Sequence, residues 1–379
     1  MLGPFVIRIS ELSHGGACSI RFAFRSLLYL CRMLDNNKRT EISELGEFGL
    51  IKHLTQNIKL QHENSLKGVG DDAAVIDNGN GTVTLVSTDM LVEGIHFDLS
   101  YVPLKHLGYK CATVNFSDIC AMNGTPKQLL VSIAISSRFP LDAVEELYSG
   151  IHAACSNYQV DLVGGDTTSS TSGLVISCTI IGEAKKEDVV YRNGAQDKDL
   201  ICVTGDLGGA YTGLLLLERE KEVFKSNPGA QPDLDGNDYI LERQLKPEAR
   251  IDVIQMLKDR GVKPTSMIDI SDGLASEILH LTSQSDLGAN VFEEKIPIDP
   301  MTFERARSFN LDPTMCAMNG GEDYELLFTI SLADHEKLQH NPDVTFIGHM
   351  AAKSSGVNMI SRSNTVHPIT AQGWDALKK

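Results

Sequence analysis

Hydrophobic residues along the chain recur at two spacings, and together they predict alternating helices and strands. Phe48, Ile51 and Leu54 recur at helical spacing and predict an early helix. Other runs are short, β-branched and apolar, and these predict strands. The elements predicted for the first half are helices at 43–56, 104–124 and 141–158, and strands at 82–89, 129–136, 161–168 and 174–184.

A polar stretch at 191–199 interrupts this pattern and predicts a domain boundary. A second alternation follows it, with a strand from Leu200, a glycine loop and a helix, then a helix at 247–261. The segment 221–237 is rich in Pro, Gly, Asn and Asp and is expected to be a mobile excursion. The run 320–330 is predicted to be a strand, with Tyr324, Leu326, Phe328 and Ile330 alternating.

Two α/β domains in tandem are therefore expected. The expected boundaries are an extension at 1–40, an N-terminal α/β domain at 41–190, a C-terminal α/β domain at 197–350 and a closing segment at 351–379.

The first 34 residues differ from the rest because they hold four arginines and a single acid, Glu11. Arginines interrupt their apolar run, so it is not expected to cross a membrane as a helix. Such a composition also occurs in transit peptides. The preferred interpretation is that the functional chain begins at Met33 and that residues 1–32 have no role.

Net charge narrows the classes of partner. The formal charge of −16 argues against nucleic acid and anionic membranes, which attract clustered Lys and Arg. A phosphorylated substrate remains compatible with an acidic protein when metal ions reverse the local field. The eight cysteines form no CxxC motif and no cluster with histidine, which favours a reducing cytoplasm and excludes a zinc site.

One motif recurs, an apolar strand that ends in Asp beside Gly, Ser or Thr. Its aspartates are Asp71, Asp72, Asp89, Asp166, Asp206, Asp269 and Asp272. Asp118 lies on a predicted helix three residues after Asn115, so both side chains share a face. Carboxylates backed by hydroxyls and carbonyls are ligands that Mg²⁺ prefers. The motif predicts a site that handles phosphate through magnesium.

Each aspartate also has a structural interpretation. An Asp after a strand is often a turn residue or a helix cap, and Ser271 with Asp272 fits an N-cap and a first-turn acid. For any one of these aspartates, a role in a turn or a helix cap explains the residue at least as well as metal binding does. The whole set favours metal binding, because so many carboxylates in one cleft would repel one another without cations.

Other phosphate-binding signatures are weak or absent. The sequence has no GxxxxGK[ST] motif, no serine elbow, no HExxH and no kinase catalytic set. A loose GxGxxA pattern at Gly68–Ala73 follows a polar run, so a dinucleotide fingerprint is not expected. GDLGGAYTG follows a strand and opens a helix, which suits either anion binding or a close-packed turn.

The motifs taken in order resemble the thiamine-monophosphate kinase family, within the wider superfamily of aminoimidazole-ribonucleotide synthetase. The resemblance covers Gly46 to Trp374 and is carried by GEFGLI, GVGDDAAV, VSTDMLVEGIHF, ATVNFSDICAMNGTP, VGGDTT, YRNGAQDKD, RQLKPEAR, IDISDGL, GGEDYELLFT and the terminal GW. It implies a two-domain α/β (α+β) fold of the aminoimidazole-ribonucleotide synthetase type. It also implies a cytoplasmic homodimer in which the N-terminal sheets pair into a barrel.

The resemblance further implies the reaction ATP + thiamine monophosphate → ADP + thiamine diphosphate, with several Mg²⁺ ions. The N-terminal domain would hold metal and ATP, and 351–379 would close on the substrate. The implied metal ligands are Asp72, Ser87, Thr88, Asp89, Asp118, Asp166, Asp269 and Asp272. The implied ATP-binding residues are Gly165, Asp166, Arg192, Ser271 and Tyr148, and the implied residues for the thiamine end are His96, Glu322 and Trp374.

These implied roles agree with the chemistry. The acceptor oxygen is already anionic, so no general base is needed and positioning with charge neutralisation suffices. Trp374 suits stacking on a cationic or flat ring, although packing on the core is its alternative role. Instead of binding substrate, His96 could be a structural histidine whose hydrogen bonds are satisfied within the protein. Instead of binding ATP, Arg192 could be a solvated residue of the linker.

Four rival functions are weighed against this one. A selenophosphate synthetase needs a reactive residue in an N-terminal glycine-rich loop, where no Cys lies between Cys31 and Cys111. A carbamoyl dehydratase of hydrogenase maturation ends in cysteine, whereas this chain ends in Lys379. Aminoimidazole-ribonucleotide synthetase is the closer rival, and GIHF and the terminal GW argue against it. A non-catalytic Mg–nucleotide regulator needs fewer carboxylates.

Overall fold

The computed structural model describes residues 42–371. These fall into two units, one holding residues 42–57 and the other residues 58–371. The first unit contains helix α2 (Ile42–Thr55), which is kinked at Gly46, where φ is +66°. This helix confirms the element expected at 43–56. The expected extension at 1–40 lies outside the described residues.

The larger unit contains two sheets, and the first is built by residues 65–185. Its strand order is β1-β2-β3-β6-β4-β5. The strands are β1 (Ser65–Lys67), β2 (Ala74–Asp77), β3 (Thr82–Val92), β4 (Thr125–Ile135), β5 (Asp161–Ser169) and β6 (Val175–Lys185). Only β4 and β5 pair in parallel, and helix α4 connects them; the other neighbours are antiparallel. We call this part the first lobe.

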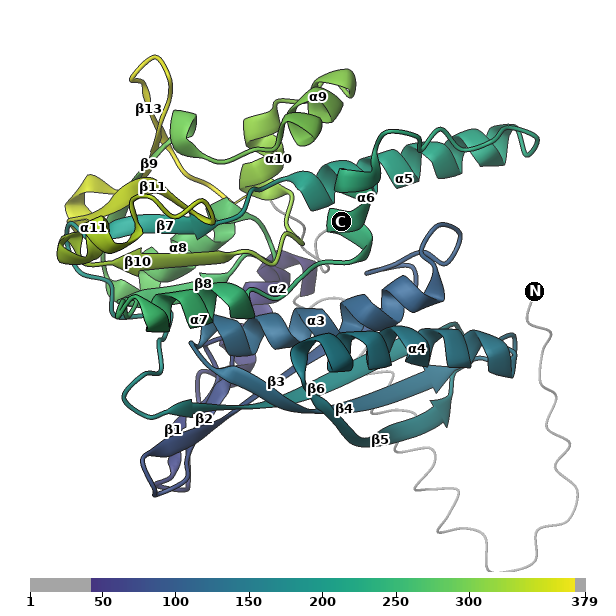
Figure 1. The fold of residues 1–379 in the computed structure, drawn as a ribbon, viewed down its shortest axis with the longest axis horizontal. Helices are drawn as coiled ribbons and strands as arrows, with labels where there is room; N and C mark the ends of the chain where they lie inside the picture. The colour runs from purple at the N-terminus through teal and green to yellow at the C-terminus, as the bar shows by residue number, and fades with distance from the viewer. Residues whose placement is uncertain (1–41, 372–379) are drawn as a thin grey trace, which may run out of the picture. The chain divides into compact units, whose positions relative to one another are not determined.

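Two helices of the first lobe, α3 (Leu104–Ala121) and α4 (Leu141–Tyr158), lie side by side on one face of its sheet (Figure 1). Burial alternates along β6, as expected when one face of a sheet packs on helices and the other does not. The helices approach closely through two glycines. A Cβ at Gly108 would lie 1.9 Å from the carbonyl oxygen of Leu147, and one at Gly150 would lie 1.9 Å from that of Lys105.

The second sheet, with the helices that follow Leu200, forms the second lobe. Its strand order is β13-β12-β9-β11-β7-β10-β8. The strands are β7 (Leu200–Thr204), β8 (Ser266–Asp269), β9 (Gly288–Phe292), β10 (Leu326–Ile330), β11 (Val344–Ala351), β12 (Val357–Ile360) and β13 (Val366–Pro368). The helices are α5 (Gly209–Ser226), α6 (Asp238–Leu245), α7 (Ile251–Asp259), α8 (Leu274–Ser285), α9 (Pro300–Ser308), α10 (Pro313–Asn319) and α11 (His335–Leu338).

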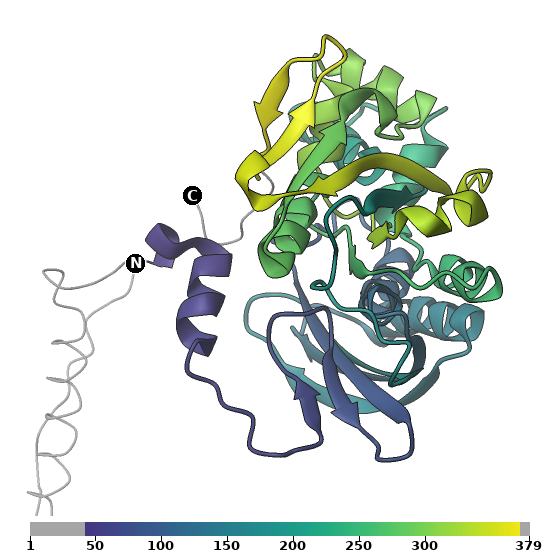
Figure 2. The ribbon, with the colours of Figure 1, turned by 90° about the vertical axis from the view of Figure 1, so that its left-hand side faces the viewer.

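Helix α3 lies between the two sheets, which Figure 2 shows by looking along α3 and α4. One side of α3 packs on β3, β4 and β6, and another side contacts β8, α6 and α7 of the second lobe. Every residue from Leu107 to Ser117 is buried as a result. A helix buried on all sides has no solvent-facing stripe, so each polar residue in it needs a specific partner.

Two expectations from the sequence were wrong. The predicted strand at 320–330 begins only at Leu326, because Glu322 and Tyr324 have φ of +58° and +51°, which a strand does not accommodate. The strand is also buried throughout rather than alternating. The predicted excursion at 221–237 is partly helical, because α5 continues to Ser226 with an ion pair of 2.7 Å between Lys225 and Glu222.

Within residues 42–371, no helix combines the length and the apolar character that crossing a membrane requires.

Candidate active site

A cavity of about 160 Å³ lies where α3, the end of β3 and two loops of the second lobe meet. The loops follow β8 and precede β10. The lining residues are Asp89, Met90, Leu91, His96, Lys110, Val114, Asp118, Asp269, Ser271, Glu322 and Tyr324. Six residues predicted for the site from the sequence are thus brought to one cavity, although they span more than 230 positions of the chain.

One face of α3 forms a wall of this cavity. Lys110, Val114 and Asp118 are spaced by four residues, so they lie one above another on the helix. At a rise of 1.5 Å per residue, Lys110 and Asp118 are about 12 Å apart along the axis. The cavity therefore has a carboxylate end and a lysine end.

At the carboxylate end, Asp118 and Asp269 form a cluster with Asp72, which does not itself line the cavity. Each of the three has a carboxylate oxygen within 4.8 Å of those of the other two. Hydroxyl groups fix two of them, since Ser87 Oγ donates to Asp118 at 2.6 Å and Ser117 Oγ donates to Asp269 at 2.6 Å. Asp72 Oδ2 is buried without a hydrogen-bond partner. Three converging carboxylates with an unsatisfied oxygen fit the oxygen ligand set of a hard divalent cation.

The electrostatics of the cluster support the same interpretation. Burial raises the pKa of Asp72 to about 7 even though Arg192 acts to lower it, and burial raises that of Asp269 to about 6. The pKa of Asp118 lies well above its ordinary value because of burial and the repulsion of Asp89 and Asp269. A cation bound here would remove this repulsion and keep the carboxylates charged.

Arg192 lies in the linker between the lobes and pairs with the cluster. Its Nη2 and Nε donate to Asp72 Oδ1 at 2.6 and 3.2 Å, and its backbone N–H donates to Asp71 at 3.1 Å. Both bonds from the guanidinium go to Oδ1 of Asp72, so Oδ2 is left without a hydrogen-bond partner. The interpretation of Arg192 as a solvated linker residue is therefore wrong, because its guanidinium is partly buried and paired with a carboxylate.

Asp89 lies within β3, which continues three residues beyond the end predicted at 89, and it lines the cavity. Asn115 Oδ1 accepts from the backbone N–H of Asp89 at 3.2 Å and so ties the strand to α3. Burial raises the pKa of Asp89 to about 6. Thr88 points to the opposite face of the sheet, as the alternation of a strand requires, and its hydroxyl donates to the carbonyl of Cys178 at 2.9 Å.

The loop Ser271–Asp272 follows β8 and is held by a residue that the sequence reasoning missed. Glu277, buried on α8, accepts from the backbone N–H groups of Ser271 and Asp272 at 3.1 and 2.8 Å. This carboxylate fixes the loop from the interior. Glu277 lies five residues after Asp272, outside the three-residue spacing of a capping box, so the sequence carried no local signal for this contact.

The remaining predicted ATP-binding residues lie apart from the cavity lining. Gly165 and Asp166 lie exposed on the edge strand β5, where Asp166 pairs in register with Ser132. Tyr148 lies on α4, with its ring 6.3 Å from that of His152. Trp374 lies outside the described residues.

The lysine end of the cavity holds His96 and Glu322. His96 Nδ1 accepts from the backbone N–H of Val92 at 3.0 Å, which orients the ring. Glu322 is paired with Lys110 at 2.8 Å and accepts from Gln244 Nε2 at 2.9 Å. The sequence reasoning missed Lys110 and Gln244, since a lysine within a helix gives no sign of burial.

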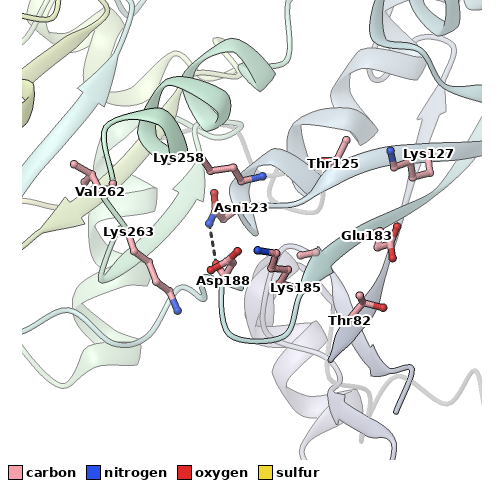
Figure 3. A pocket seen from close by; sticks show the side chains of 12 residues that line it. Thr82, Asn123, Thr125, Lys127, Glu183, Lys185, Asp188, Lys258, Val262 and Lys263 are labelled. Atoms are coloured by element: carbon pink, nitrogen blue, oxygen red, sulfur yellow. Dashed lines mark hydrogen bonds between the residues drawn. The ribbon is translucent and has the colours of Figure 1, made fainter. Parts of the chain in front are cut away.

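A larger hollow of about 570 Å³ lies elsewhere on the molecule (Figure 3). Four lysines line it from both lobes, Lys127, Lys185, Lys258 and Lys263, together with Glu183 and Asp188. It shares no lining residue with the carboxylate cavity. Its lysines are exposed and it has no carboxylate cluster, so we assign the phosphate chemistry to the smaller cavity despite the difference in volume.

The fold and the cavity identify a class of protein first. The family model described as "AIR synthase related protein, N-terminal domain" matches residues 70–184, which carry the first lobe. This agrees with an α/β protein of two sheets whose acidic residues gather at the junction of the lobes.

Comparisons over the whole chain are more specific. The thiamine-monophosphate kinase of Bacillus subtilis is 33% identical over 343 residues, covering 88% of this chain and 100% of the relative. That of Aquifex aeolicus is 33% identical over 335 residues, covering 88% and 98%. A solved structure described as "AaThiL complexed with AMPPCP and TMP" superposes with a TM-score of 0.75 at 30% identity, covering 89% of this chain and 99% of that one. The chain belongs to the thiamine-monophosphate kinase family.

Proposed function

We propose that this protein transfers the terminal phosphoryl group of ATP to thiamine monophosphate and releases ADP and thiamine diphosphate. The observation that carries the proposal is the cluster of Asp72, Asp118 and Asp269, two of which line a cavity between two lobes. Relatives named as thiamine-monophosphate kinases match nearly the whole chain, and one of them is complexed with AMPPCP and TMP.

Several Mg²⁺ ions are proposed as cofactors. Bound Mg²⁺ would neutralise charge on the transferred phosphoryl group and its neighbours. The proposed ligands are Asp72, Ser87, Thr88, Asp89, Asp118, Asp166, Asp269 and Asp272. Thr88 has the least support, because its hydroxyl points to the opposite face of the sheet and bonds the carbonyl of Cys178. Support is strongest for Asp72, Asp118 and Asp269, whose oxygens converge, and for Asp89, which lines the same cavity. Ser87 contacts Asp118, and its hydroxyl orients that carboxylate.

ATP is proposed to bind along the first lobe, with Gly165, Asp166, Tyr148, Arg192 and Ser271 in contact with it. Ser271 lines the cavity, and Arg192 already donates to the cluster that would meet the phosphates. The guanidinium is a fixed cation suited to charge on phosphate oxygens. The domain at 41–190 would then hold both metal and nucleotide.

Thiamine monophosphate is proposed to enter from the lysine end, where His96 and Glu322 line the cavity, with Trp374 and the segment 351–379 closing on it. Its phosphate would point toward the carboxylate end. The accepting oxygen is anionic at neutral pH, so no side chain has to remove a proton. The residues of this chain orient the two phosphates in line and keep water out.

The sheet of the first lobe supports the proposed homodimer. Its face opposite α3 and α4 is not covered by any helix of residues 58–371 (Figures 1 and 2). Met90 on β3 and Val163 on β5 are 57% and 55% exposed. A second copy pairing its own sheet there, as in a closed barrel, would bury such residues. A cytoplasmic location is proposed with it, and the six described cysteines, all buried and unpaired, are compatible with that.

The test is ADP release by purified protein with Mg²⁺, ATP and one acceptor at a time. Thiamine monophosphate is expected to support turnover, and thiamine is not. Turnover with formylglycinamidine ribonucleotide alone would favour an aminoimidazole-ribonucleotide synthetase instead. Nucleotide binding without turnover of any acceptor would favour the non-catalytic regulator.

A further inference from the structure

Lys110 is an unusual residue to find in the middle of α3. It lies within the stretch from Leu107 to Ser117 in which every residue is buried, and its side chain is 6% exposed. Burying an ammonium group is unfavourable unless it is paired and hydrogen-bonded. Lys110 meets this requirement through residues of the second lobe, with Nζ 2.8 Å from Glu322 and donating to the carbonyl of Gln244 at 3.2 Å.

Its partner Glu322 belongs to a constrained loop. Gly321, Glu322 and Tyr324 all have positive φ, a backbone conformation that residues other than glycine rarely adopt. The backbone N–H of Glu322 donates to Ser271 at 2.7 Å, and that of Tyr324 donates to Ile270 at 2.9 Å. Strained backbone conformations that surrounding contacts maintain are common at functional sites.

The residues after Glu322 anchor the loop to the second lobe. Asp323 accepts from the backbone N–H of Gly208 at 2.8 Å, and Glu325 pairs with Arg243 and Arg250 at 3.0 and 2.7 Å. The second lobe therefore fixes the backbone around Glu322. The side chain of Glu322 is fixed from the other direction, by Lys110 on α3 and by the amide of Gln244.

Charge also sets Lys110 apart within the cavity. Four carboxylates line it, from Asp89, Asp118, Asp269 and Glu322, and Lys110 is its single lysine. Burial alone would raise the pKa of Glu322, but Lys110 and Gln244 outweigh burial and hold that pKa below its ordinary value. Glu322 is thereby kept as a carboxylate beside Lys110, and Lys110 lies about 12 Å along α3 from Asp118.

We propose that Lys110 is a positioning residue for the acceptor, which acts by holding the carboxylate of Glu322 toward the organic end of thiamine monophosphate. The inference rests on the proposed function, in which Glu322 contacts that end. The ion pair between Lys110 of the first lobe and Glu322 of the second would then determine specificity for the acceptor. Affinity for ATP, at the other end of the cavity, does not depend on this pair.

The experiment measures KM for thiamine monophosphate, KM for ATP and kcat in Lys110→Met, Lys110→Arg, Glu322→Gln and the double variant Lys110→Met/Glu322→Gln. Lys105→Met is the matched control, since Lys105 is an exposed residue of the same helix. Thermal unfolding of each variant shows how much of it is folded.

Lys110→Met is expected to raise KM for thiamine monophosphate by about tenfold, because Glu322, whose side chain is 29% exposed, loses the charged partner that orients it. KM for ATP is expected to stay within about twofold, since separate sites behave independently. Lys110→Arg is expected to recover most of the loss. The double variant is expected to bind the acceptor no worse than Glu322→Gln alone, because Lys110 acts through Glu322.

The outcomes separate this inference from the proposed function. If Glu322→Gln leaves KM for the acceptor unchanged, the assignment of Glu322 itself fails. If Glu322→Gln weakens the acceptor but Lys110→Met does not, only the role of Lys110 is overturned. Effects that add in the double variant, or that raise both KM values equally, would mean that Lys110 only stabilises the fold. If Lys110→Met does not fold, Lys110→Gln, which also removes the charge paired with Glu322 but keeps a hydrogen-bond donor, is compared in the same way, and unchanged KM for the acceptor in it overturns the role of Lys110.

Discussion

The hydroxyl of Ser117 donates a hydrogen bond of 2.6 Å to the carboxylate of Asp269, across the junction of the two lobes. Ser117 is on α3 of the first lobe, and Asp269 is the last residue of β8 in the second. Both are buried. The bond therefore fixes an acid of one lobe against the acids of the other.

Replacing Ser117 with Ala tests how far this bond orients Asp269. We expect unfolding to become easier by about 1–3 kcal/mol, because a buried carboxylate loses a donor. We also expect turnover to fall by about tenfold, since small displacements of a ligand weaken positioning. Thermal denaturation and steady-state kinetics measure the two effects. Ser117→Thr keeps the hydroxyl and should lie closer to the unsubstituted protein; equal losses in both variants would contradict the argument.

Asp118→Asn tests the carboxylate cluster directly. We expect kcat to fall by about 100-fold or more, because one charged ligand is lost from a site built on charge neutralisation. The increase in melting temperature on adding Mg²⁺ should also diminish. Asp161→Asn is the control, since Asp161 begins β5 and is exposed. Similar losses in both variants would show that net charge, not the cluster, matters.

The raised pKa values of the cluster predict a stability that depends on pH in opposite ways with and without cations. Without a cation, the folded state retains protons that the unfolded state has lost, because burial raises the pKa of Asp72 from 3.8 to about 7. The free energy of unfolding should therefore fall as the pH rises through this interval. Melting temperatures in EDTA from about pH 5 to pH 8 measure this slope.

With Mg²⁺ present the charged carboxylates are favoured, so the stabilisation by the cation should grow as the pH rises. Asp118→Asn should flatten both dependences. A stabilisation by Mg²⁺ that is constant across this interval would contradict the assignment of the cation to these acids.

Arg192→Met tests the pairing with Asp72. The variant leaves a buried carboxylate without its guanidinium, so we expect a loss of about 3 kcal/mol in the free energy of unfolding. Asp72→Asn in the same background removes the unpaired charge and should restore part of that stability. If the second substitution adds a further full loss, the two residues are not coupled. Chemical denaturation of the single and double variants provides the measurement.

Gly150→Ala tests the close approach of α3 and α4. A Cβ at Gly150 would lie 1.9 Å from the carbonyl oxygen of Lys105, so the helices must separate. We expect a loss of about 3 kcal/mol or more in stability, the upper range for overpacking. Ser149→Ala at the exposed neighbouring position should change stability by at most about 0.5 kcal/mol. Equal stability of the two variants would show that the helices have room to adjust.

Some parts of the site were predictable from the sequence and others were not. An apolar strand that ends in Asp is a local pattern, and it predicted a metal-binding cluster whose aspartates include Asp72 and Asp269, which the structure brings together. The strand itself was predicted correctly only for Asp269, which ends β8, whereas Asp72 lies in the segment between β1 and β2. That the acids lie between two lobes also followed from their distribution along the chain. The roles of individual residues remain predictions. The domain boundaries also remain predictions.

What could not be predicted depends on contacts between distant segments. Lys110 looks like any solvated lysine on a helix until β8, α6 and α7 are seen to cover α3. Tyr324 to Ile330 alternate as a strand does, but Tyr324 is held in the left-handed region by its bond to Ile270. In both cases tertiary contacts outweighed the local signal.

The burial of α3 also limits how this protein can change during evolution. From Leu107 to Ser117 every residue is buried. A substitution at any of these positions therefore changes contacts with neighbouring residues. An insertion of one residue would turn the rest of the helix by about 100°. Lys110 and Asp118 would then no longer face the same cavity. Length and register of this helix should therefore stay fixed among functional descendants, while the exposed ends of α4 and α5 are free to vary.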